Sequence, residues 1–315
     1  MTRAGVDVGG SGIRAQVESG GARGSSRIIS AIPRDNGHID IDALATLISR
    51  SVSEARSTID APPPDVVCVG MSGLPDLVAD PTRLGTLIGS LVSARRVLLA
   101  SDAVTTHVGA LELVPGTVVA AGTGVVALGT DLEAVWNRTD GWGLLLGDEG
   151  GGAWVGQQGV IAALRAADGR QGGSGMLLDL MRETLGPVDH VVSTVYASPA
   201  PSYLLGGFAP SVAAAAVEGD SVAQAIWREA GQRLAAAGLA AATNLEPLFS
   251  WGGRLFDAGP VVLVPFTEAI IAGRRGAQVV EPQGSSTDGA LTLARKHASG
   301  APVNHPPYIQ TYDAS

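Results

Sequence analysis

Two short glycine-rich segments are the residues of this chain best suited to holding a phosphate group. They are Gly9-Gly10-Ser11-Gly12 and Gly122-Thr123-Gly124, and each follows an apolar run. After Gly12, apolar and polar residues alternate from Ile13 to Glu18, so a strand leaves this turn. Glycine lets backbone N–H groups approach a phosphate closely. The sequence therefore predicts two phosphate-holding hairpins, with an ordinary hairpin turn as the alternative for either one taken alone.

These glycines do not match two common nucleotide-binding fingerprints. A dinucleotide-binding loop has spaced glycines that open a helix, whereas a strand follows Gly12. A Walker-type loop needs a lysine beside Ser or Thr, and the one lysine of the chain, Lys296, is close to the C-terminus. The hairpin interpretation remains, and Asp7 on the incoming strand is placed to hold Mg²⁺ through water.

Asp102 is the candidate catalytic residue. It follows the apolar run 97–100 and precedes a predicted helix over 105–113, and α/β proteins place their sites where such strands end. An aspartate at this position is equally suited to capping the helix. Between two phosphate hairpins, its carboxylate can accept a proton from a substrate hydroxyl that attacks a phosphoryl group. We predict that role for Asp102.

Two further glycine-rich segments are candidate ligand contacts. The stretch from Gly141 to Gly152 holds an apolar triplet and the acid pair Asp148 and Glu149. A flexible loop before a helix with acids in its first turn is one interpretation, and the glycine density favours a fixed loop that approaches a ligand. Gly252 and Gly253 would let a planar base such as adenine approach the backbone, and a plain turn fits that segment nearly as well.

The order of the predicted elements indicates a duplicated α/β fold. Three strands are followed by helix, strand, helix and strand, which is the order of a ribonuclease-H-like half-domain, and the strand–glycine turn–strand pattern recurs from Val118. We therefore predict two ribonuclease-H-like lobes with a central cleft, over residues 1–115 and 116–287. Three C-terminal features complete the prediction: a strand over 261–264, a helix over about 288–299 that packs back on the first lobe, and an irregular tail over 300–315.

Composition narrows the classes of function. The 315 residues carry a formal net charge of −9, with a pI of about 5.0, which argues against a nucleic-acid partner. No apolar stretch is long enough to predict a membrane span, so we expect a cytoplasmic protein. Cys68 is the only cysteine and lies in an apolar run, and the five histidines are scattered. We therefore expect no internal disulfide and no cysteine or histidine metal cluster.

Six motifs occur along the chain in the following order: Asp7-Val8-Gly9-Gly10-Ser11-Gly12, Ser101-Asp102-Ala103, Ala121-Gly122-Thr123-Gly124, Gly141-Trp142-Gly143, Gly147-Asp148-Glu149-Gly150 and Trp251-Gly252-Gly253. With these motifs the chain resembles, over nearly its whole length, the N-acetylglucosamine kinase and BadF/BadG-type ATPase family of the actin-like ATPase superfamily. The segment from Gly-Trp-Gly to Gly-Asp-Glu-Gly is the most specific of them.

The resemblance implies ATP-dependent transfer of phosphate to the 6-hydroxyl of glucosamine or N-acetylglucosamine, with Asp102 as the base and Asp7 near Mg²⁺. It implies that the nucleotide or sugar is contacted by glycine-turn residues, which are Gly9, Gly10, Ser11, Gly12, Gly122, Thr123, Gly124, Gly252 and Gly253. It implies that the sugar is also contacted by Asn36, Gly141 and Asp148, of which Asn36 also suits a simple turn. A free 2-amino group would favour Glu149 as its partner, and an acetyl group would favour an apolar niche. The family further implies a homodimer through the second lobe.

Two other functions stay open. An ATPase that activates a partner reductase or dehydratase would need an iron–sulfur cluster at a subunit interface, and the lone Cys68 within a strand speaks against it. A non-catalytic, sugar-binding regulator is disfavoured because Asp7 and Asp102 are both present and the first strand begins too early for a DNA-binding domain to precede it.

Overall fold

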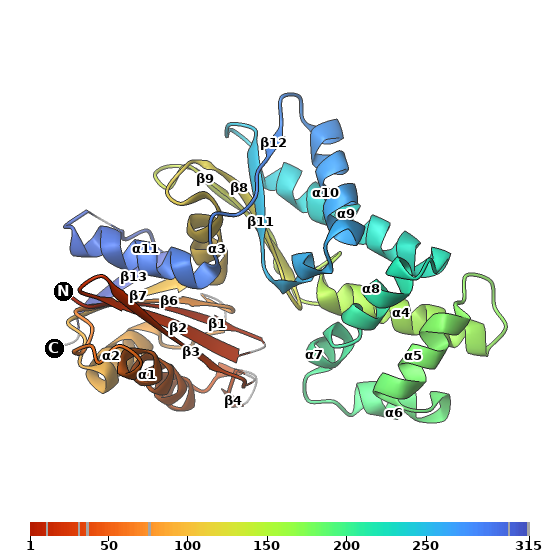
Figure 1. Ribbon diagram of the computed structural model, residues 1–315, viewed down its shortest axis with the longest axis horizontal. Coiled ribbons are helices and arrows are strands. Elements are labelled where there is room, and N and C mark those ends of the chain that lie inside the picture. The colour runs from red at the N-terminus through yellow and green to blue at the C-terminus, as the bar shows by residue number, and fades with distance from the viewer. Residues whose placement is uncertain (11, 31, 36–37, 75–76, 302, 314–315) are drawn as a thin grey trace. The chain divides into compact units, whose positions relative to one another are not determined.

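The computed structural model describes all residues except 11, 31, 36–37, 75–76, 302 and 314–315. The chain forms two compact α/β units (Figure 1). Unit 1 comprises Met1–Val114 with Pro282–Ser315, and unit 2 comprises Pro115–Glu281. Each unit has its own sheet and its own apolar core, as the predicted fold class requires.

Unit 1 is built on a six-stranded sheet in the order β13-β7-β6-β1-β2-β3. The strand bounds are β1 Arg3–Gly9, β2 Gly12–Ser19, β3 Ala22–Ile28, β6 Val66–Met71, β7 Arg96–Ser101 and β13 Ile309–Asp313, and a separate pair consists of β4 Arg34–Asp35 and β5 His38–Ile39. Strands β1, β2 and β3 are antiparallel neighbours, whereas β6 and β7 run parallel to β1. From β3 to β7 this is the ribonuclease-H-like arrangement that the element order predicts.

Helices cover both faces of this sheet (Figure 1). On one face, α1 (Ile41–Ser57) and α2 (Pro81–Val92) bury apolar residues against Ala4, Val6 and Val8 of β1. On the other face lie α3 (Asp102–Leu111) and α11 (Ser286–Ala298). A Cβ atom at Gly5 would overlap the backbone of α11, so glycine permits the close approach of this helix to β1.

Unit 2 repeats the same strand order with a second set of strands. Its sheet runs β10-β9-β8-β11-β12, with β8 antiparallel to β9 and parallel to β11. The strand bounds are β8 Gly116–Ala121, β9 Val125–Thr130, β10 Trp136–Asp140, β11 Leu248–Gly252 and β12 Gln278–Val279. The recurrence predicted from Val118 onward is therefore present.

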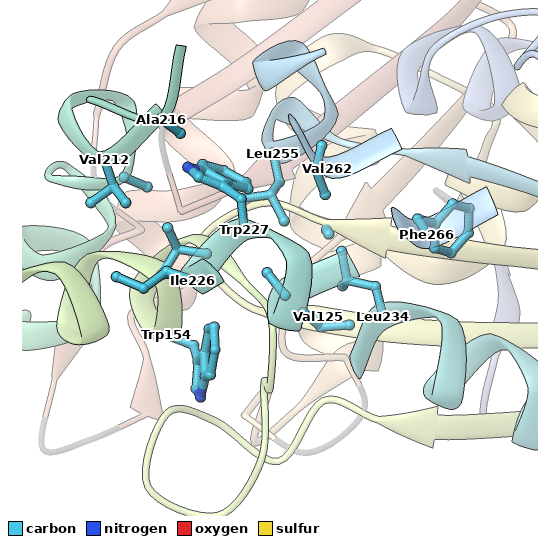
Figure 2. Packing of buried hydrophobic residues seen from close by; sticks show 14 of the residues in the cluster. Val125, Trp154, Val212, Ala216, Ile226, Trp227, Leu234, Leu255, Val262 and Phe266 are labelled. Atoms are coloured by element: carbon cyan, nitrogen blue, oxygen red, sulfur yellow. The ribbon is translucent and has the colours of Figure 1, made fainter. Parts of the chain in front are cut away.

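The helices of unit 2 enclose an aliphatic and alanine-rich core. They are α4 Gly152–Ala167, α5 Gly175–Leu185, α6 Val188–Tyr196, α7 Pro201–Gly206, α8 Ala209–Val217, α9 Ser221–Ala241 and α10 Pro260–Gly273, together with the 3₁₀ turn η1 Arg254–Ala258. Figure 2 shows Trp227 of α9 packed near Leu255 and Val262. Burial of each such large side chain stabilises the fold by roughly 1.5–3 kcal/mol. In the part of the chain that the structure describes, every helix is too short or too polar to cross a membrane.

Two expectations for the C-terminal part of the chain were wrong. Residues 261–264, predicted as a strand, begin helix α10, where Pro260 occupies a first-turn position that needs no N–H donor. The tail over 300–315, predicted to be irregular, contains β13, which pairs antiparallel with β7. A strand at this place depends on the open edge of β7, and local sequence carries no signal of that edge.

Candidate active site

Unit 1 brings its two predicted acidic residues to the same edge of the sheet. Strands β1, β6 and β7 are parallel, so their carboxyl ends lie together. Asp7 is aligned with Gly70 of β6, and Gly70 is aligned with Ala100 of β7. Asp102 follows the last residue of β7 as the first residue of α3. Since neighbouring strands are about 4.8 Å apart, β1 and β7 are separated by about 10 Å.

Asp7 also lies on the sheet face that α3 covers. Cross-strand neighbours project to the same face, and Asp7 is the neighbour of Gly70. A Cβ atom at Gly70 would overlap the side chain of Thr105 in α3, which identifies this face as the one beneath α3. Asp7 and Asp102 therefore occupy one corner of unit 1, defined by a shared edge and a shared face.

Asp7 is mostly buried and has a charged partner. Its Oδ2 accepts a hydrogen bond from Arg14 Nη1 at 2.8 Å, and its side chain is 13% exposed. Among the described residues, no group of three or more His, Cys, Asp or Glu could hold a metal ion. A carboxylate oxygen is nevertheless a suitable Mg²⁺ ligand, because Mg²⁺ is commonly held by one or two carboxylates together with substrate phosphates. Asp7 thus fits a metal ion that arrives with a nucleotide.

The backbone of Asp102 is anchored to its surroundings. The N-cap of α3 is Ser101, whose side chain makes no capping hydrogen bond, and Asp102 is an acid in the first turn of the helix. The hydroxyl of Thr105 donates to the Asp102 carbonyl oxygen at 3.2 Å and pairs with the Ser286 hydroxyl of α11 at 2.8 Å. The half-buried Asp102 is therefore carried by a helix turn that is tied to a second helix.

The first glycine turn joins β1 to β2. Gly9 and Gly12 form its closing pair, and Gly10 is exposed. Gly12 has a φ of +133°, and a Cβ atom there would overlap the carbonyl oxygen of Ile28. Gly12 is therefore required by the backbone itself. Two predicted site residues, Ser11 and Asn36, lie outside the described residues.

The second glycine turn is fastened to the start of helix α4. The backbone N–H of Gly152 donates to the Gly122 carbonyl at 2.8 Å, and that of Ala153 donates to the Thr123 carbonyl at 2.9 Å. These bonds satisfy two of the donors that a helix N-terminus leaves unpaired. They also direct the positive end of the α4 dipole at the turn, which favours a bound anion.

Asp148 lies directly against this turn. A Cβ atom at Gly124 would overlap the Asp148 carboxylate, so only glycine leaves room for it. Burial raises the pKa of Asp148, and the charge of nearby Asp140 acts in the same direction. Hydrogen bonds from the backbone N–H groups of Val125 and Gly143 oppose that shift without cancelling it. The structure thus joins two predicted site segments that lie more than twenty residues apart.

Glu149 is engaged elsewhere. Its carboxylate pairs with Arg233 of α9 at 2.6 Å, and the Arg233 guanidinium also pairs with Glu229 and lies 5.2 Å from the ring centre of Trp154. A groove of about 640 Å³ is lined by these α9 residues and by loop residues that include Asp140 and Glu149. Beside this groove, the carbonyl of Gly141 accepts a hydrogen bond from Arg138 at 3.0 Å.

Gly252 and Gly253 join the second glycine turn at the same edge of the unit 2 sheet. Gly252, the last residue of β11, is aligned with Ala120 of β8. Gly253 has a φ of +93°, and a Cβ atom there would overlap the carbonyl oxygen of Ala121, the residue before the turn. Two glycine segments more than a hundred residues apart are therefore adjacent.

Asp140 is a candidate site residue that the sequence analysis missed. Its Oδ1 accepts hydrogen bonds from the backbone N–H groups of Gly141 and Asp148, each at 2.8 Å. The available signal was an aspartate directly before Gly-Trp-Gly, because aspartate tolerates left-handed backbone and bonds to nearby N–H groups. Asp140 has a φ of +63°.

Comparisons with known proteins show the family and the fold. The N-acetylmuramic acid/N-acetylglucosamine kinase of Clostridium acetobutylicum is 24% identical over 237 residues, which are 73% of this chain and 76% of that protein. A candidate N-acetylglucosamine kinase from Chromobacterium violaceum superposes with a TM-score of 0.73 at 25% identity, over 92% of this chain and 97% of that one. A ROK family glucokinase from Streptomyces griseus, solved with glucose and AMPPNP, shares the fold at 18% identity, with a TM-score of 0.65 over 94% of this chain and 98% of that one. The model of the BadF/BadG/BcrA/BcrD ATPase family matches residues 4–292, and the chain therefore belongs to that family.

Proposed function

We propose that the protein is an ATP-dependent kinase that phosphorylates the 6-hydroxyl of an amino sugar, glucosamine or N-acetylglucosamine. Membership of an ATPase family supports the use of ATP, and relatives named as N-acetylglucosamine kinases support the sugar. The observation that carries the proposal is the corner of unit 1, where Asp102 begins α3 on the same sheet edge and face as Asp7.

Asp102 is the proposed general base. As the sugar 6-hydroxyl attacks the γ-phosphorus, its proton passes to the Asp102 carboxylate, and the bond from phosphorus to the β,γ-bridging oxygen breaks to release ADP. The backbone N–H groups of Gly9 to Gly12 and of Thr123 and Gly124 hold phosphate oxygens, whereas the Gly122 N–H closes the second turn by donating to the Gly124 carbonyl. The α4 N-terminus adds positive potential at the second turn. Asp7 would hold Mg²⁺, which neutralises phosphate charge when bound.

Asp148, Thr123 and Gly141 are the proposed sugar contacts in unit 2. The Asp148 carboxylate is half-buried, and an ionised carboxylate gives strong, directional hydrogen bonds to sugar hydroxyls. Glu149 already has a compensating charge in Arg233, which favours an acetylated sugar over one with a free amine. Gly252 and Gly253 are the proposed backbone contacts of the adenine. The family resemblance further supports a cytoplasmic homodimer.

The test is ADP release from Mg²⁺-ATP with N-acetylglucosamine, glucosamine, N-acetylmannosamine and glucose. We expect sugar-dependent release, and we expect Asp102→Asn to lower kcat by about 10²- to 10⁴-fold while sugar affinity is retained. Asp42→Asn is the matched control, because Asp42 is also an acid in the first turn of a unit 1 helix. It should behave like the wild type.

Each alternative function predicts another outcome of the same assay. Sugar-independent ADP release that persists in Asp102→Asn would support an ATPase that activates a partner. Sugar binding without any ADP release would support a regulator.

A further inference from the structure

The two ends of the glycine-rich loop of unit 2 donate hydrogen bonds to the same carboxylate. Asp140 is the last residue of β10, and its Oδ1 accepts the N–H of Gly141 at the start of the loop and the N–H of Asp148 at its end. Gly147 lies so close that a Cβ atom there would overlap this Oδ1. The segment 141–147 is therefore closed at its base by the Asp140 side chain.

The conformation that this closure maintains is an unusual one. Asp140 and Asp148 both have positive φ, at 63° and 56°. An L-residue holds such a backbone only where its surroundings compensate the strain. The hydrogen bond from the Asp148 N–H to the Asp140 carboxylate therefore acts directly on a residue with strained backbone. From this conformation its carboxylate reaches Gly124 and accepts the N–H groups of Val125 and Gly143.

Three large apolar side chains of the loop are exposed to solvent. Leu145 is 92% exposed, Leu146 is 83% exposed and Trp142 is 67% exposed. Within the loop, the N–H groups of Leu146 and Gly147 donate to the Gly143 carbonyl, and these bonds hold its shape without attaching it to the sheet. Within the loop, Leu144 packs against the core of unit 2, and the Arg138 guanidinium lies over the Trp142 ring. At the base, Asp140 contacts both ends of the loop and Arg138 contacts the first, so the Asp140 side chain joins the two ends directly.

From these contacts we propose that Asp140 is a positioning residue, whose carboxylate closes the loop and thereby places the Asp148 carboxylate against the second glycine turn for sugar binding. The consequence for sugar binding rests on the proposed function. The closure itself rests only on the hydrogen bonds and backbone angles described above.

The first test compares three variants in the sugar kinase assay. Asp140→Ala removes both accepted bonds and should raise the KM for the sugar by about tenfold or more, with the KM for ATP within about twofold. Asp140→Asn keeps an oxygen acceptor and should remain within about threefold of the wild type for both substrates. The matched control is Asp131→Ala, because Asp131 Oδ1 accepts three loop N–H groups, those of Glu133, Ala134 and Val135, between β9 and β10. It should change neither KM.

The second test follows backbone amide exchange in the whole protein and needs no catalysis. Asp140→Ala should accelerate exchange at Asp148 and Val125, whereas Asp131→Ala should leave both amides unchanged. If Asp140→Ala does not fold, Gly147→Ala is the substitute, because its methyl group displaces the Asp140 oxygen while keeping the carboxylate.

Unchanged exchange at Asp148 and Val125 would overturn the proposal, and so would an equal rise of both KM values. Absence of sugar-dependent ADP release in the wild type would overturn the proposed function instead. In that case, amide exchange still decides whether Asp140 closes the loop.

Discussion

The two units share one strand order but obtain their acidic side chains differently. In unit 1, the residue two positions before the closing pair of the glycine turn is Asp7, which lies opposite Arg14. In unit 2 the equivalent position is Val119, which lies opposite Ala127, and both residues are fully buried. One scaffold thus carries an ion pair at a position where its repeat carries apolar core.

The cause of this difference is the helix that covers the second position. A Cβ atom at Gly238 of α9 would lie 2.9 Å from the Val119 side chain, so α9 packs tightly on that face. An ionised side chain beneath a helix would pay a large desolvation cost. Unit 2 therefore takes its acid from the loop that carries Asp148. The comparison teaches that a strand can supply a mostly buried carboxylate where a charged partner, here Arg14, compensates it.

The first prediction from this comparison concerns the space that the loop acid needs, and it is the largest expected effect on sugar binding. Gly124→Ala should raise the KM for the sugar by about ten- to a hundredfold, about 1.4–2.7 kcal/mol, because the new methyl group displaces the Asp148 carboxylate. The stability of unit 2 should change little, since the displaced group is the end of a side chain. The control is Gly175→Ala at the start of α5, whose Cβ atom would also meet nothing within 4 Å. Equal effects of the two variants in steady-state kinetics would contradict this explanation.

Gly12, in the first glycine turn, should affect stability, whereas Gly124 should affect sugar binding. Gly12→Ala should lower the free energy of unfolding by about 2–3 kcal/mol, because its φ of +133° and the Ile28 carbonyl leave no room for a methyl group. Gly9→Ala, at the other end of the turn, meets no neighbour within 4 Å and should cost less than about 1 kcal/mol.

Urea unfolding can assign that loss to a unit. All five tryptophans lie in unit 2, so their fluorescence reports unit 2, whereas far-UV circular dichroism reports both units. Gly12→Ala should shift the circular dichroism transition more than the fluorescence transition. A loss confined to the fluorescence signal would show that the turn of unit 1 tolerates the methyl group.

The third prediction concerns pH. Burial raises the pKa of Asp148 above the ordinary value of 3.8, so the folded protein binds this proton more tightly than the unfolded chain does. The contribution of Asp148 to stability therefore falls as pH rises from about 3.8 through the raised folded pKa. Asp148→Asn should gain stability relative to the wild type over that interval, as measured by urea unfolding at a series of pH values.

Asp131 supplies a control of opposite sign. Burial tends to raise its pKa, but N–H bonds from Val135, Glu133 and Ala134 lower it overall. Its stabilising contribution is present above pH 3.8 and is lost as pH falls through the lowered folded pKa. Asp131→Asn should therefore lose stability relative to the wild type as pH rises. If the stability difference from the wild type changed with pH in the same direction for both variants, the raised pKa of Asp148 would be contradicted.

The smallest expected effect concerns the ion pair of unit 1. Arg14→Met should lower stability by about 1 kcal/mol or less, because the pair is partly exposed. It should also lower the Mg²⁺ concentration for half-maximal rate by about two- to threefold, because the positive charge of Arg14 no longer offsets the negative charge of Asp7. Arg3→Met removes the Arg3–Glu18 pair at the far end of the same hairpin and should leave the Mg²⁺ dependence unchanged. Identical Mg²⁺ titrations for the two variants would contradict the proposed role of Asp7 in holding Mg²⁺.

Much of the framework could be read from the sequence because it depends on neighbours in the chain. Alternation after Gly12 indicated a strand, and a buried run before Asp102 indicated a strand end. These signals arise within a few residues, through side-chain periodicity and turn chemistry. They were sufficient for both hairpins, for the repeated fold, and for Asp102 at the start of α3.

Other features depended on partners distant in the chain, and only the tertiary structure decided them. The residues over 261–264 are three valines and one leucine, yet they form a helix that packs on α9. The tail became β13 because β7 had an open edge. Asp148 reached Gly124 because Asp140 closes a loop whose tip is exposed. The sequence by itself determined which residues can do chemistry and which turns carry them, since these are local properties of the chain. The tertiary structure decided which of them meet, because burial, register and open sheet edges exist only once distant segments have packed.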